Sequence, residues 1–134
     1  MTKTPKQVLV AETDPAPGSL TAAQCAQEVI DLHAFFQGWL DGSLPATDAA
    51  FDRFLSTAHP QFTLISPDGS QAGREATAAW IRAAHGTRLG VRLWTTDHVL
   101  HYADSHTAVM IYREWQTNPG MTGEMTTLRL STAV

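Results

Sequence analysis

Hydrophobic residues recur at helical spacing through the first half of the chain. Thr21 followed by Gln24 has the form of a capping box, and the apolar positions of residues 25–40 then make one wide face of a helix. Thr47 is placed to cap a second helix, and a third is expected over about residues 74–85. The first half of the chain is therefore predicted to be mainly helical.

The second half has the spacing of β-strands. Residues 91–102 are rich in β-branched and aromatic types, residues 107–117 alternate with a period of two, and residues 122–134 are again extended in pattern. Polar segments at 103–106 and 118–120 can turn the chain between them. Three long strands joined by short turns make an antiparallel meander.

A short strand and a tight turn connect the two halves. The local sequence is Phe62-Thr63-Leu64-Ile65-Ser66-Pro67-Asp68-Gly69, followed by Gly73-Arg74-Glu75-Ala76 at the start of the third helix. With the order of elements around it, this segment resembles the SnoaL-like and ketosteroid-isomerase-like proteins of the nuclear transport factor 2-like superfamily. The resemblance covers about residues 20–134.

The resemblance implies an α+β fold in which a cone-shaped, curved antiparallel sheet wraps around three helices, the cystatin-like or ketosteroid-isomerase-like roll. It also implies a deep apolar pocket and a homodimer packed through the sheets. Residues 1–18 are expected to be a flexible N-terminal tail, and residues 19–134 the SnoaL-like domain. Relatives carry a further strand where this chain reaches Val134, so either the sequence is truncated or the sheet ends one strand early. We expect another chain or the N-terminal segment to cover the open edge.

Composition narrows the class of protein. The net charge is −4 and the basic residues are scattered, so no nucleic-acid partner is expected. Cys25 is the only cysteine, which favours a reducing compartment. No segment is apolar and long enough to suggest a membrane span. We expect a cytoplasmic protein, and the Ala- and Arg-rich, Lys-poor composition is typical of a bacterial source.

The resemblance also implies acid-base chemistry, and the sequence departs from part of it. The carboxylate base of the isomerases falls at Ser66 and their tyrosine donor near Phe35, and neither residue type can do that work. This argues against steroid isomerisation. The related cyclases use an Asp or a His in the same pocket, so His59 and His101, with Tyr112 as a hydrogen-bond donor, form the candidate catalytic set.

Other polar and aromatic residues are candidates for ligand binding. Tyr112 and Glu114 share one face of a strand, and Arg129 on the next strand can join them in a patch for a carbonyl or carboxylate group. The alternative is a cross-strand salt bridge on a surface facing solvent or a dimer partner. Three aromatic residues are expected either to line the pocket or to fill the core: Trp39, Phe62 and Trp80.

No metal or cofactor is expected. His98 and His101 are three residues apart, which places them on opposite faces of a strand unless a bulge intervenes. The expected function is binding of a small apolar, carbonyl-bearing ligand in an internal pocket, with isomerase-, cyclase- or hydratase-like activity left open. The alternative is a non-catalytic dimeric interaction module that uses the outer sheet face, at Val109, Ile111 and Trp115.

Overall fold

The computed structural model describes residues 20–118 and the backbone of residues 125–133. Its helices are α1 (Ala22–Leu40), α2 (Asp48–Leu55) and α3 (Arg74–Ala83). Two antiparallel sheets follow: β1 (Thr63–Ile65) with β2 (Gln71–Gly73), and β3 (Arg92–Ala103), β4 (Ala108–Thr117) and β5 (Met125–Ala133) in that order. The predicted order of helices and strands is confirmed.

The first two helices begin at the predicted caps. The Thr21 hydroxyl accepts a hydrogen bond from the backbone N–H of Gln24, and the Gln24 side chain accepts one from the N–H of Thr21. The Thr47 hydroxyl accepts in the same way from the N–H of Ala50. Each cap satisfies backbone donors that the first turn of a helix leaves unpaired, so local sequence is enough to fix where α1 and α2 start.

Two of the predicted turns also form as their sequences suggest. Gly69 ends the turn between β1 and β2 with a φ of +87°, a conformation that glycine adopts without strain. Between β3 and β4, Oδ1 of Asp104 accepts from the backbone N–H groups of His106 and Thr107. The predicted turn at 118–120, the N-terminal tail and any cover that it gives to the sheet lie outside the described residues.

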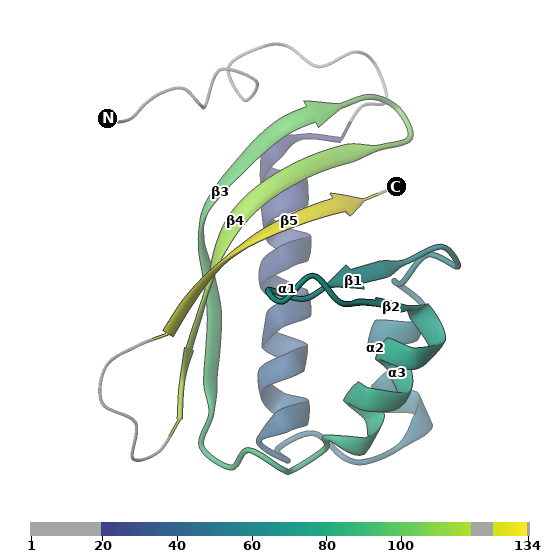
Figure 1. Ribbon diagram of the computed structural model, residues 1–134, viewed down its shortest axis with the longest axis vertical. Helices are drawn as coiled ribbons and strands as arrows, with labels where there is room; N and C mark the ends of the chain where they lie inside the picture. Colours follow the sequence, from purple (N-terminus) through teal and green to yellow (C-terminus); the bar gives the residue numbers. More distant parts are fainter. Residues whose placement is uncertain (1–19, 119–124, 134) are drawn as a thin grey trace.

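Helix α1 is the central element of the fold (Figure 1). The curved three-stranded sheet lies along one side of α1, and α2, α3 and the β1–β2 hairpin lie on the other side. The sheet therefore packs directly on α1, with the two shorter helices behind it. The α+β roll predicted from the sequence is confirmed in this arrangement.

Two hydrophobic clusters meet at α1. The first, between α1 and the sheet, contains Cys25, Val29, Leu100, Ala108, Met110 and Tyr112. The second, among the three helices, contains Phe35, Trp39, Phe51, Phe54, Ala78 and Ile81. Fully burying a large apolar side chain contributes roughly 1.5–3 kcal/mol, so these clusters are the main source of stability.

Strand β3 contains two irregularities that change which side chains face α1. The pairing with β4 shifts between Thr96 and Val99, and again between Leu100 and Tyr102. Asp97 lies at the first shift with a φ of +57°, which a short polar side chain tolerates better than most. The bulge moves the inward-facing positions from odd-numbered residues, such as Leu93, to even-numbered ones, and Leu100 is accordingly buried.

Candidate functional site

The inner face of β4 carries the two polar residues that the sequence placed on one side of the strand. Glu114 is 6 % exposed and Tyr112 7 % exposed, whereas Arg113 between them is exposed. Tyr112 belongs to the cluster between α1 and the sheet. The structure therefore decides what the sequence left open: Tyr112 and Glu114 face α1, and Arg113 and Trp115 face outward.

His33 of α1 is the partner of Glu114. Its Nε2 lies 3.3 Å from Oε1 of Glu114, and both side chains are buried. Its Nδ1 lies 2.8 Å from the backbone carbonyl oxygen of Val29. A carbonyl oxygen can only accept, so Nδ1 carries a hydrogen and donates it. A hydrogen bond between Nε2 and Oε1 then requires one hydrogen, carried either by the imidazole or by the carboxyl group.

Aromatic rings surround His33. The rings of Phe36 and Tyr112 each meet it edge-on with centroids 5.5 Å away. The His98 ring also stacks on Tyr112 with centroids 6.0 Å apart, and its Nε2 is hydrogen-bonded to Thr95. Such rings exclude water from the pair and lower the local dielectric constant.

His98 has a perturbed acidity in this position. Burial lowers the pKa of His98 below its ordinary value, the carboxylate of Asp97 opposes that shift, and the nearby His33 adds to it. The bulge at Asp97 is responsible, because it turns His98 toward Tyr112. A neutral imidazole on this face can accept or donate a hydrogen bond near neutral pH.

A chain of hydrogen bonds connects Glu114 to a cation nearer the surface. Oε2 of Glu114 accepts from Nε2 of Gln116 at 2.7 Å, and Oε1 of Gln116 accepts from the guanidinium of Arg88 at 2.9 Å. The same guanidinium also donates to Asn118. A positive charge relayed through an amide favours a negative carboxylate at Glu114.

Several predicted site residues lie elsewhere. His59 is exposed after the end of α2, and its Nδ1 accepts from the backbone N–H of Gln61. His101 is exposed at the second irregularity of β3. In the structure neither His59 nor His101 lies against Tyr112, whose ring neighbours are His33 and His98. The bulges explain why His98 and not His101 lies against Tyr112, because they invert the alternation of inward- and outward-facing side chains along β3.

The remaining candidates divide between the core and the surface. Trp39 is 1 % exposed and its Nε1–H donates to the carbonyl of Ile81, so it is a core residue that joins α1 to α3. Phe62 is half-buried and packs edge-on against Phe54. Trp80 is 66 % exposed. In the backbone register of β4 and β5, Arg129 lies opposite Tyr112.

The sequence did contain a signal for His33. It lies four residues after Val29 and three before Phe36, in the middle of the apolar stripe of α1. A lone histidine on such a stripe needs a buried polar partner, and Glu114 on an inward-facing strand position is the acid that could provide it.

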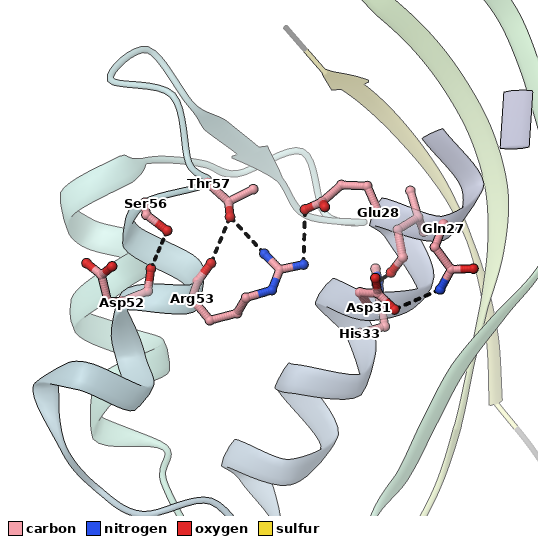
Figure 2. A network of polar contacts seen from close by, with 9 residues as sticks. Gln27, Glu28, Asp31, His33, Asp52, Arg53, Ser56 and Thr57 are labelled. Carbon is pink, nitrogen blue, oxygen red and sulfur yellow. Dashed lines mark hydrogen bonds and ion pairs between the residues drawn. The ribbon is translucent and has the colours of Figure 1, made fainter. Parts of the chain in front are cut away.

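A second polar network holds α2 against α1, away from the sheet (Figure 2). Arg53 of α2 reaches Glu28 of α1 at 3.1 Å and also donates to Thr57. Both charged side chains are partly exposed, so the ion pair contributes at most about 1 kcal/mol. Its role is to orient α2 on α1, on the side opposite the sheet.

Other classes of function depend on metal ligands or on membrane-spanning helices. Among the side chains of residues 20–118 there is no group of three or more His, Cys, Asp or Glu placed to hold a metal ion. Within the same residues no helix is both long and apolar enough to cross a membrane.

Comparison with known proteins identifies the fold. No protein-family model matches the chain. An NTF-2-like protein of unknown function from Pseudomonas aeruginosa superimposes with a TM-score of 0.66 at 24 % identity, covering 83 % of this chain and 82 % of that chain. The chain therefore has the nuclear transport factor 2-like fold that its sequence resembles.

Two further likenesses are weaker. An LEH-like epoxide hydrolase from M. tuberculosis superimposes with a TM-score of 0.47 at 14 % identity, covering 81 % of this chain and 71 % of that chain. A score below 0.5 supports no argument about the site. Sucrose-phosphatase 1 of Nicotiana tabacum is 23 % identical over 93 residues, which are 68 % of this chain and 22 % of that protein. The matched segment is about a fifth of that enzyme's length.

Proposed function

We propose that the chain binds a small apolar, carbonyl-bearing molecule on the inner face of the sheet, and that the His33–Glu114 pair transfers a proton to or from it. The observation that carries the proposal is the buried pair itself, with Nε2 of His33 3.3 Å from Oε1 of Glu114 among aromatic rings. Hydrogen bonds of catalytic groups are often this long before a ligand arrives and shorten in its complex.

A buried pair of ionisable side chains contributes little net stability to a hydrophobic core. Removing two ionisable groups from water costs several kcal/mol per ion, and hydrophobic side chains of similar volume usually stabilise a fold equally well or better. Buried acid and base groups are therefore found more often at functional sites than in an ordinary core. The pair lies beside the concave face of a sheet, where side chains of two layers can surround a ligand.

The proposed step is proton abstraction next to a carbonyl group. The Glu114 carboxylate takes a proton from the carbon beside the carbonyl, the C–H electron pair forms a C=C bond, and the π pair of the carbonyl moves to its oxygen to give an enolate. Tyr112, two residues away on the same face, is the proposed donor to that oxygen, and Arg129 lies opposite it in the register. Return of the proton to another carbon gives an isomerase, and return to the same carbon gives simple exchange.

Exchange of the α-hydrogens of cyclohexanone in D₂O tests the proposal without knowledge of the natural ligand. Proton NMR should show exchange faster than in buffer alone, and Glu114→Gln should abolish the enhancement because an amide cannot act as a base. His106→Ala, which alters an exposed turn histidine, is the matched control and should leave the rate unchanged. Equal rates for the wild type and Glu114→Gln would contradict the proposed chemistry.

The outer face of the sheet favours a second candidate function, association of two copies through their sheets. Trp94 and Trp115 stack there with centroids 6.2 Å apart and planes at 9°, and the Arg92 guanidinium lies over Trp94. Val109 and Ile111 continue the same face and are half-buried. A sheet face of this composition suits a dimer interface with an aromatic centre.

Sedimentation velocity tests the association directly. The wild type should sediment as a dimer at micromolar concentration, and Ile111→Glu should sediment as a monomer because it buries a charge at the contact. Glu75→Gln, an exposed change on α3, serves as the control and should remain dimeric. A wild type that stays monomeric at all concentrations would exclude this candidate.

A further inference from the structure

A second site lies on the opposite side of the helical layer, where α3 meets the β1–β2 hairpin. A hollow of about 170 Å³ opens there between the two elements. Its walls are mostly apolar, and none of the lining residues belongs to the group around Glu114: Leu64, Ser66, Ala72, Ala76, Thr77 and Trp80.

The buried lining residue Thr77 has a hydroxyl group without a hydrogen-bond partner in the part of the chain that the structure describes. Thr77 is 3 % exposed, and its hydroxyl is buried with no hydrogen-bond partner among the described residues. A hydroxyl removed from water without a partner costs about 1–3 kcal/mol, and most buried polar side chains avoid that cost. A ligand that reaches Thr77 would provide the missing hydrogen bond.

The exposed lining residue Trp80 presents an aromatic ring. Trp80 is 66 % exposed, although its two neighbours on the inner side of α3, Thr77 and Ile81, are buried. An aromatic face gains about 0.5–1.5 kcal/mol from a second ring beyond the area that the contact buries. The lining of the hollow thus includes an exposed aromatic side chain and a buried hydroxyl group without a hydrogen-bond partner within the described residues.

Size decides what can enter. An apolar cavity of roughly 150 Å³ admits a benzene ring, so the hollow has room for one ring with a small substituent. Stable protein interfaces use roughly 20–30 residues on each side, whereas six residues line this hollow. A small molecule fits these features better than a macromolecular partner.

We infer that this hollow binds a single-ring aromatic molecule bearing one hydroxyl or carbonyl group, with its ring against Trp80 and its polar atom hydrogen-bonded to Thr77. The Thr77 hydroxyl can donate to a carbonyl or accept from a phenolic hydroxyl, so either substituent satisfies it. The site is separate from the proposed acid-base pair and does not depend on that proposal.

Phenol and benzene are a suitable pair of probes, because they differ by the one group that Thr77 would recognise. In ¹H–¹⁵N NMR titrations of the full chain, phenol should shift the Trp80 indole and Thr77 amide signals at millimolar concentration and bind more tightly than benzene. Thr77→Val keeps the shape and removes the hydroxyl, so it should weaken phenol by roughly 3- to 10-fold and leave benzene within twofold. Thr77→Ser keeps the hydroxyl and should retain the preference for phenol.

Trp80→Ala should weaken both probes, since it removes the aromatic wall without touching the hydroxyl. The inference is overturned if neither probe shifts these signals, or if Thr77→Val binds phenol as well as the wild type does. It is also overturned if the Trp80 signal shifts with protein concentration in the absence of a probe and the probes do not reverse this, because the hollow would then be a contact between copies of the chain.

Discussion

Two substitutions in the buried pair should have very different effects on stability. His33→Leu removes the partner that faces Oε1 of Glu114 and leaves a carboxylate with 8 % side-chain exposure beside an apolar residue. Removing one partner of a buried ion pair typically costs about 3–5 kcal/mol, because the remaining charge has lost compensation. The bonds of Glu114 to Gln116 and beyond keep the expected loss near the lower end of that range.

Glu114→Gln should cost far less. The new amide can donate to Nε2 of His33, which is free to accept once Nδ1 donates to Val29, and its oxygen can still accept from Gln116. Both hydrogen bonds are therefore kept, and the free energy of unfolding should fall by no more than about 1 kcal/mol.

Urea denaturation followed by tryptophan fluorescence measures both changes on one scale, provided that the slope with denaturant stays constant. We expect a loss of about 3 kcal/mol for His33→Leu and of less than about 1 kcal/mol for Glu114→Gln. Equal losses for the two variants would refute the assignment of the Nδ1 hydrogen to Val29. A small loss for His33→Leu would show that the pair is solvated and not buried.

Three further predictions follow from single side chains. Thr77→Val should raise the free energy of unfolding by about 1 kcal/mol without ligand, measured by urea midpoint, since it removes a buried hydroxyl with no partner. Burial lowers the pKa of His98 in the folded protein below the value of about 6.5 in the unfolded chain. The contribution of the neutral ring to stability is therefore present above the unfolded pKa and is lost as the pH falls through the lower folded pKa. NMR titration of the His98 ring should accordingly give a midpoint below about 6.5. Trp39→Phe should lower the free energy of unfolding by about 2–4 kcal/mol, because it loses the hydrogen bond to Ile81 and leaves a space in the core. Trp80→Phe, at an exposed position, should change the same free energy by less than about 0.5 kcal/mol.

The features that could be predicted from the sequence are those set by neighbouring residues. Thr21 and Thr47 cap helices because their hydroxyls reach backbone N–H groups three residues further on, and Gly69 closes its turn because its own φ is positive. The alternation of β4 placed Tyr112 and Glu114 on one face for the same reason. None of these inferences needs knowledge of where a distant segment lies.

The site could be predicted only in part, because it depends on contacts between distant segments. His33 and Glu114 are 81 residues apart, and only the packing of β4 on α1 brings them together. A regular strand would place His101 on the same face as Leu93, and the bulge at Asp97 breaks that alternation and turns His98 inward instead. His59 is a candidate from the family resemblance, but its side chain accepts a hydrogen bond from the backbone N–H of Gln61 at the surface.

The nature of the pair distinguishes a structural role from a chemical one. A polar contact kept only to fix how α1 packs on the sheet needs one donor and one acceptor, and a glutamine at position 114 would satisfy it without the desolvation cost of a carboxylate. Glutamate adds an exchangeable proton and a negative charge. The relay through Gln116 to Arg88 supports that charge at some distance from solvent. A carboxylate is required at position 114 only if its proton or its charge takes part in a reaction. If Glu114→Gln keeps near-normal stability but loses proton exchange, the pair has a catalytic role and not a structural one.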